Sequence, residues 1–337
     1  MPTIYDALVA PNPKLDIIAE QLKNTPGSLI NVEKDNVSIW HDFNRNTILA
    51  AYHDLLSFSA LGGALPAGGG KQKSGGKGLS LKEFWSTISA TSNMSGCAYI
   101  IRNRLGLPPL AASGSSNGLA LDFHPFELNQ GSWMGQRLDD PDWFVYAGDK
   151  QNHALFVLGE GKTHHTWHSS RLASMSAVGT HKHLLPLQLV ATCLRHTGTR
   201  YGFLVTAHEF VALRVHHIDS YSIGHGTFGK AGVEYRAIPW HSNSGGETSG
   251  AGGLTVNLAL WALAMMGAND SGRIYGELGT YLSASPGVWS RAADGSLVHT
   301  LSGRRASEAE VRAAVGDEVV IMENSHGMTL RSGSGRH

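Results

Sequence analysis

The chain has 337 residues, of which 42% are hydrophobic and 16% charged, a composition typical of a globular protein with a core of its own. Its 27 basic and 27 acidic side chains cancel, so it lacks the basic excess that a dedicated nucleic-acid binder usually carries, although a local basic cleft is compatible with this balance. Two cysteines exclude a disulfide framework and cysteine-rich zinc sites. No apolar run approaches 18 residues and the N-terminal sequence lacks the pattern of a secretory signal, so we expect an intracellular protein, in the cytoplasm or nucleus, that does not enter a membrane.

Residues 1–80 are predicted to form a mainly helical N-terminal lobe. The spacing of apolar residues predicts helices over 12–24 and 46–61, and alternation predicts a strand over 28–40. Residues 62–80 consist almost entirely of Gly, Lys, Ser and Ala, which cannot bury enough apolar area to offset the entropy of ordering, so a flexible loop is predicted there.

Helices and strands alternate over residues 81–270, which indicates an α/β (α+β) core. One or two helices are predicted over 80–107, and a strand over 119–128. The run at 254–268 is apolar on nearly every helical face, so this helix is expected to be buried. The other predicted elements are strands at 141–148 and 154–163, a helix at 184–198, and strands at 200–207, 209–218 and 232–240.

Residues 271–325 are predicted to form a C-terminal β-rich extension, and residues 326–337 a polar tail. The extension holds short strand patterns at 287–293, 296–301 and 318–322 and a charged helix pattern at 305–315.

Two acids and a lysine stand at the ends of the two strands within 141–163, where Val, Ile or Thr would be usual. In an antiparallel hairpin the start of one strand lies beside the end of the next, so Asp142 and Glu160 are expected to be neighbours. Lys162, two residues after Glu160, should point to the same face. Close carboxylates repel each other, and Mg²⁺ or Mn²⁺ would relieve that repulsion, with the carbonyl of Gly161 as a third ligand. Lys162 would then hold or deprotonate a water and stabilise charge on a phosphate.

Pro141-Asp142 followed by Glu160-Gly161-Lys162 resembles the motif of the PD-(D/E)XK nuclease superfamily, which has the restriction-endonuclease-like fold. A helix before the motif hairpin, and a helix and a strand after it, fit the same pattern, and the runs from 200 to 266 look like uncharacterised fungal members. The resemblance covers roughly residues 85–270. It implies a central mixed β-sheet flanked by helices, with an N-terminal helical addition. The implied activity is divalent-metal-dependent phosphodiester hydrolysis by a nuclease acting on DNA or RNA. A homodimer is compatible with the resemblance, because many nucleases of this fold dimerise, but the sequence does not determine the oligomeric state.

Some members of the superfamily carry further site residues on the flanking helices. Gln188 matches by position a glutamine that the resemblance implies would bond a phosphate or hold Lys162, although Thr192 stands where some members have a tyrosine. For a glutamate before the motif, the chain offers Glu83 or Glu127, and a solvated helix cap is the simpler role for Glu83.

Histidines cluster after the motif lysine. Clustered imidazoles can bind zinc or copper, or one can serve as a general base, but this spacing matches no zinc pattern and loop histidines are the simpler interpretation. His164 is the exception, because it lies two residues beyond Lys162 and would line the same cleft. The others are His165, His168, His181 and His183.

Three functions remain open from the sequence. The first is the metal-dependent nuclease or a related phosphodiesterase, with Asp142, Glu160 and Gly161 binding Mg²⁺ or Mn²⁺. The second keeps the fold but performs acid–base catalysis on a small-molecule substrate, for instance in fungal secondary metabolism, because neutral charge and many histidines suit such a pocket. The third is a non-catalytic interaction protein. The predicted partner is accordingly a nucleic acid or a small molecule.

Overall fold

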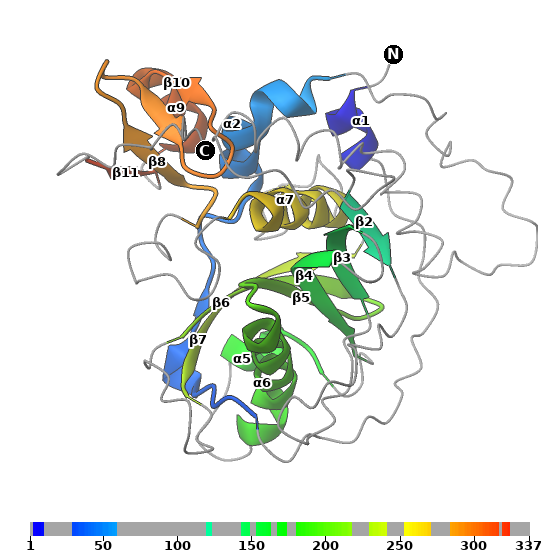
Figure 1. Ribbon diagram of the computed structural model, residues 1–337. Helices are drawn as coiled ribbons and strands as arrows, with labels where there is room; N and C mark the ends of the chain where they lie inside the picture. Colours follow the sequence, from blue (N-terminus) through cyan, green and yellow to red (C-terminus); the bar gives the residue numbers. More distant parts are fainter. Residues whose placement is uncertain are drawn as a thin grey trace, which may run out of the picture.

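A seven-stranded mixed sheet forms the centre of the described part of the chain (Figure 1). The computed structural model describes residues 3–9, 29–58, 119–122, 143–148, 153–162, 167–173, 180–217, 229–240, 253–270, 284–316 and 319–323. The helices predicted at 12–24 and 80–107, the loop at 62–80 and the tail at 326–337 lie outside these residues. The α/β class with a mixed sheet flanked by helices is confirmed.

The strand order of this sheet follows from two antiparallel meanders joined by a parallel pair. β2, β3 and β4 form the first meander, β5, β6 and β7 the second, and β4 pairs in parallel with β5. β1 adds to the edge of β7 in parallel. In spatial order the strands are β1 (Val37–Ile39), β7 (Ala231–Pro239), β6 (Glu209–His217), β5 (Tyr201–Val205), β4 (His153–Gly161), β3 (Trp143–Gly148) and β2 (Leu119–Asp122).

Helices cover both faces of the sheet (Figure 1). On one face lie α5 (Ser170–Ala173) and α6 (Thr180–Thr197), which connects β4 to β5. On the other face lies α7 (Val256–Asn269), with α1 (Ile4–Leu8) and α2 (Arg45–Leu56) beyond it. Each face has its own large hydrophobic cluster, so the sheet is buried on both sides.

The predicted burial of the helix at 254–268 is confirmed, since every residue of α7 is buried. Thr255 caps its start by accepting a hydrogen bond from the backbone N–H of Leu258 at 3.2 Å. A Cβ at Gly267 would lie 2.6 Å from the carbonyl oxygen of Phe156, so glycine lets α7 approach the backbone of β4 directly.

The strand predicted at 28–40 is much shorter in the structure. Only β1 is a strand, because Lys34–Asn36 form a 3₁₀ turn that interrupts the extended chain, and Asn31 makes an isolated bridge to Lys230. The edge strand of the central sheet therefore comes from the segment assigned above to the N-terminal lobe.

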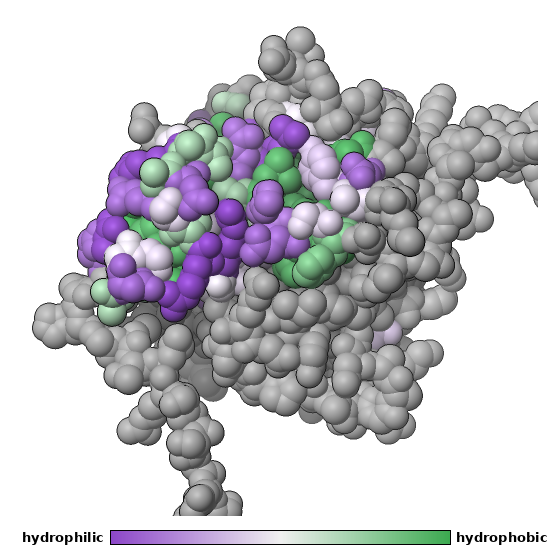
Figure 2. Space-filling view, turned by 90° about the horizontal axis from the view of Figure 1, so that it is seen from above, coloured by the Kyte–Doolittle hydropathy of each residue, from purple (hydrophilic) through white to green (hydrophobic). Residues whose placement is uncertain are grey.

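The C-terminal part forms a second, four-stranded sheet with a small core of its own. Its order is β10 (Arg305–Ala306), β9 (Leu297–His299), β8 (Val288–Arg291) and β11 (Val320–Met322), and α9 (Glu308–Val315) packs between this sheet and α2. The predicted strands correspond to β8, β9 and β11, and the predicted helix to α9. The outer surface of this unit is mainly hydrophilic (Figure 2).

A kink in α2 provides the attachment for this second sheet. Tyr52 has non-helical angles (φ −120°, ψ 16°), which leaves carbonyls of the preceding turn available as acceptors. Ser302 Oγ donates to the carbonyl of Ala51 at 2.5 Å, and the guanidinium of Arg304 donates to that of Ala50.

None of the helices within the described ranges has the length and apolarity needed to cross a bilayer.

Candidate functional site

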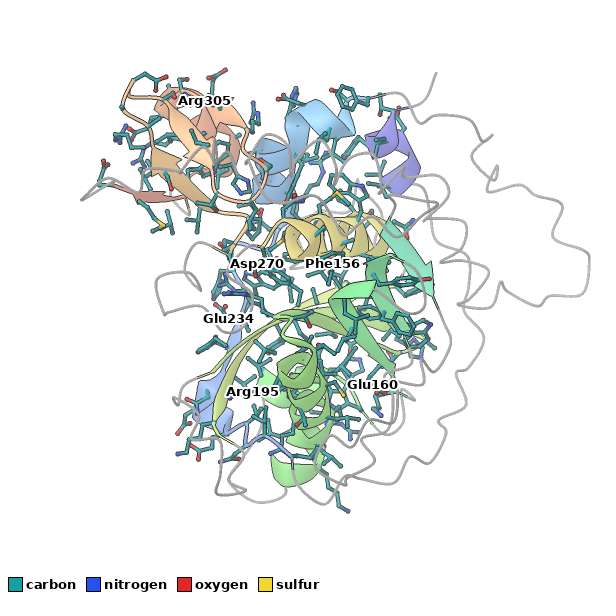
Figure 3. The ribbon with its side chains drawn as sticks, viewed as in Figure 1. Phe156, Glu160, Arg195, Glu234, Asp270 and Arg305 are labelled. Atoms are coloured by element: carbon teal, nitrogen blue, oxygen red, sulfur yellow. The ribbon has the colours of Figure 1, made fainter. Side chains whose placement is uncertain are left out.

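The structure brings Glu160 and Lys162 together at the carboxyl end of β4. The side chain of Glu160 is 1% exposed, and its Oε2 lies 3.7 Å from Nζ of Lys162, which is 11% exposed. The backbone N–H of Lys162 donates to the carbonyl of Val205 at 2.9 Å, which fixes the end of β4 against β5. Figure 3 shows Glu160 on the side of the sheet that carries α6, and Phe156 toward α7 on the other side.

Alternation along β4 explains why Glu160 faces α6. Leu158 belongs to the hydrophobic cluster under α6, and Glu160, two residues later, shares its face. Gly159 between them lies under the ring of Phe203, to which a Cβ would approach within 2.1 Å. Phe203 in turn stacks on Phe210, with ring centroids 5.0 Å apart, so aromatic packing behind the strand holds Glu160 in place.

The hairpin that the motif requires is present, and its register is close to the expected one. β3 begins at Trp143, which pairs with Gly159, so the first described residue of β3 lies beside the residue that precedes Glu160. Asp142 lies outside the described residues, and its proximity to Glu160 stays a prediction. Glu83, Glu127 and His164 also lie outside the described part of the chain.

The donor set that the structure describes fits a hard divalent cation in kind. Glu160 offers carboxylate oxygens and Gly161 a backbone carbonyl, the ligand types that Mg²⁺ prefers. Within the described ranges no group of three or more His, Cys, Asp or Glu side chains is placed to hold a metal ion. The second carboxylate of the predicted site would therefore come from Asp142.

Gln188 lies on α6 and is buried. The backbone carbonyl of Gln188 accepts a hydrogen bond from the hydroxyl of Thr192 at 2.6 Å. The Oγ1 of Thr192 in turn accepts a hydrogen bond from the backbone N–H of Ile30 at 2.9 Å. Residues four apart share a helix face, so the stripe of α6 that carries Gln188 turns toward the segment at 29–32. A contact between Gln188 and Lys162 stays a prediction.

A second buried carboxylate, Glu209, was not singled out from the sequence. It begins β6 and is 6% exposed. Its Oε1 accepts a hydrogen bond from the backbone N–H of Ser169 at 2.7 Å, and its Oε2 accepts one from the hydroxyl of Ser169 at 2.6 Å. Nδ1 of His168 lies 3.6 Å from Oε1. The signal in the sequence was an acid at the first position of an apolar strand, the same kind of signal that drew attention to Asp142.

Glu209 belongs to the same end and the same face of the sheet as Glu160. β4 and β5 end where β6 begins, because β4 pairs in parallel with β5 and β5 in antiparallel with β6. Glu209 lies two residues before Val211, which packs under α6, so the two side chains share a face of the sheet. Strands lie about 4.8 Å apart, so β6 runs about 10 Å from β4. Trp167 is anchored nearby through its indole N–H, which donates to the carbonyl of His183 on α6 at 3.0 Å.

A different ionic cluster occupies the opposite face and end of the sheet. Arg200 and Asp270 approach to 2.7 Å, and Arg214 and Glu234 to 2.5 Å, all largely buried. Burial raises the pKa of Tyr201 well above its usual value, and the charge of Asp270 raises it further. Figure 3 places Asp270 and Glu234 together on this side of the sheet, between α7 and β7. Arg214 and Tyr201 attach Ala284 to the sheet, because the carbonyl of Ala284 accepts hydrogen bonds from the guanidinium of Arg214 at 2.9 Å and from the hydroxyl of Tyr201 at 3.1 Å.

No family model, curated protein or solved structure matches the chain.

Proposed function

We propose that this protein is a divalent-metal-dependent phosphodiesterase that cleaves DNA or RNA at the carboxyl end of β4. The observation that carries the proposal is the Glu160–Lys162 pair, in which a carboxylate that is 1% exposed has an ammonium group 3.7 Å away. The neighbouring strand β3 begins beside Gly159, the residue that precedes Glu160. Taking a carboxylate out of water is costly, and such groups are concentrated at functional sites.

Strand alternation supports the inclusion of Asp142. Phe144 packs in the cluster under α6, so a strand period of two would put the carboxylate of Asp142 on the face that Glu160 shares. The ladder extended by one pair beyond Trp143 and Gly159 would oppose Asp142 to Glu160. The strand period and the extended ladder would both put the carboxylates of Asp142 and Glu160 side by side, which favours a metal site built from the two.

Each residue then has a defined task. Asp142, Glu160 and the carbonyl of Gly161 would hold Mg²⁺ or Mn²⁺, which when bound supplies charge for polarising a phosphate oxygen and lowers the pKa of a water. Lys162 would orient the attacking water and stabilise negative charge on the phosphoryl oxygens. Gln188 and His164 would position the phosphate backbone.

The experiment combines metal binding with cleavage. Purified protein is titrated with Mn²⁺ by calorimetry and incubated with single- and double-stranded DNA and with RNA. We expect Asp142→Asn and Glu160→Gln to lose both metal binding and cleavage, and Lys162→Met to keep metal binding and lose cleavage on the order of 10²-fold or more.

An exposed ion pair elsewhere provides the matched control. Lys230 and Glu33 approach to 3.0 Å with side chains 47% and 46% exposed. Lys230→Met and Glu33→Gln make the same chemical changes outside the site, and both should bind metal and cleave as the wild type does. Wild-type protein that binds no Mn²⁺ and cuts none of the three substrates would contradict the proposal.

A further inference from the structure

Both carboxylate oxygens of Glu209 accept hydrogen bonds from Ser169. One of its oxygens accepts the backbone N–H of Ser169 at 2.7 Å and the other accepts its hydroxyl at 2.6 Å. Hydrogen bonds to an ionised carboxylate are strong and short, and this pair holds the segment after β4 against the first residue of β6. Glu209 is therefore placed to position a neighbouring group, and the group next to it is His168.

The imidazole of His168 has a neighbour at Nδ1 for each of its protonation states. In the neutral form Nδ1 accepts the backbone N–H of Ser170 at 3.2 Å, which puts the ring hydrogen on Nε2. In the protonated form Nδ1–H would instead face Oε1 of Glu209, 3.6 Å away. Both neighbours of Nδ1 are therefore in place around the ring, and the side chain of His168 is 33% exposed.

His168 lies at the same end of the sheet as the proposed site, and the contacts described above join it to Glu209 and Ser170. Glu209 reaches it from β6, and the exposed Arg171 follows it on α5. The half-buried His183 stands on α6, where its carbonyl binds Trp167. The end of the sheet that presents Glu160 therefore also presents His168, across the end of β5.

We propose that His168 is the general acid of this site and that Glu209 is the positioning residue that orients its ring and stabilises the imidazolium. The inference rests on the proposed phosphodiesterase function. As the oxygen of the attacking water bonds to phosphorus, the bond from phosphorus to the leaving oxygen breaks, and that oxygen takes the Nε2 proton of the imidazolium. Immediately after this transfer His168 is neutral with its remaining hydrogen on Nδ1, facing Glu209, and the attacking water gives its proton to solvent. A solvent proton taken up at Nε2 then restores the imidazolium, and loss of the Nδ1 hydrogen from it gives the resting neutral form, in which Nδ1 accepts the backbone N–H of Ser170.

A comparison of leaving groups tests this role. An oligonucleotide expels an alkoxide that needs a proton, whereas bis(p-nitrophenyl) phosphate expels a phenolate that does not. With Mn²⁺, we expect His168→Asn to lower kcat for the oligonucleotide on the order of 10²-fold and to change the p-nitrophenyl rate by less than about threefold. Glu209→Gln should show the same selectivity on a smaller scale, in kcat and not in KM. His208→Asn, an exposed histidine beside Glu209, should change neither rate.

The outcomes separate this role from the function on which it rests. Equal losses on the two substrates, or no loss on the oligonucleotide, would overturn the role of His168 and leave the phosphodiesterase intact. Wild-type protein that cleaves neither substrate would overturn both. Nitrogen NMR of the full chain adds a readout independent of activity: neutral His168 should carry its hydrogen on Nε2, and a hydrogen on Nδ1 would contradict the arrangement inferred here.

Discussion

Adding a single methyl group at Gly159 should destabilise the protein, although alanine is normally better tolerated in a strand than glycine. The ring of Phe203 lies over Gly159, and three ring atoms are 2.1 to 2.6 Å from the position of an added Cβ. Ordinary contact begins at 3.4 Å, so the ring would have to retreat. It has little room, because Phe203 is fully buried between Trp143 and Phe210.

The expected cost follows from this lack of room. Overpacking of a well-filled core usually costs about 1–3 kcal/mol, which exceeds the few tenths to 1 kcal/mol that alanine would gain over glycine in the backbone. Gly159→Ala should therefore lower the free energy of unfolding by about 1–2 kcal/mol. Because Glu160 is the next residue, the proposed cleavage activity should fall in the same variant.

A double-mutant cycle identifies the cause. Unfolding in urea, followed by tryptophan fluorescence, gives the free energy for the wild type, Gly159→Ala, Phe203→Leu and the double variant. In the Phe203→Leu background the alanine should cost close to nothing, so the coupling energy should be about 1–2 kcal/mol. If Gly159→Ala costs the same in both backgrounds, the packing of Phe203 on Gly159 is not what requires glycine.

Three further predictions concern stability, each measured by the same unfolding experiment. Asp270→Asn should cost about 3–5 kcal/mol because it leaves the buried guanidinium of Arg200 uncompensated, whereas Asp294→Asn at an exposed ion pair should cost far less; equal costs would contradict this. Burial lowers the pKa of His299 to about 3, below the 6.5 of the unfolded chain. The free energy of unfolding should therefore fall by about 1.4 kcal/mol per pH unit as the pH drops from 6.5 toward 3. His299→Asn should remove this contribution to the pH dependence of the free energy of unfolding. Ser307→Ala should cost about 1 kcal/mol by removing the capping box of α9, and Ser307→Asp should retain most of it.

The apolar pattern predicted the elements that packing enforces and missed those that depend on partners far away in sequence. α6 and α7 have strong apolar periodicity or all-round apolarity, and both lie where expected. β10 has two residues and exists because it pairs with β9, which no local pattern encodes. The predicted strand at 28–40 was wrong over most of its length, since its local alternation yields to the turn at Lys34–Asn36.

The candidate site shows the same division. Glu160 and Lys162 lie two residues apart on one strand, so their common face follows from the strand period alone. The contact of Glu209 with Ser169 joins residues 40 positions apart and depends on where the chain returns after β4. A pattern of spacing cannot reveal that contact, even though an acid at the start of an apolar strand was visible.

The register of the core also determines which side chains can meet at the site. Leu158 and Val211 are buried under α6, and each is two residues from a buried carboxylate, Glu160 on β4 and Glu209 on β6. Because the side-chain period of a strand is two, a slip of one residue in either strand would carry its carboxylate to the α7 face together with the apolar set. The hydrophobic packing that stabilises the sheet therefore also selects the face on which both acids are presented. Substitutions that shift β4 or β6, and not only those that remove an acid, should impair activity.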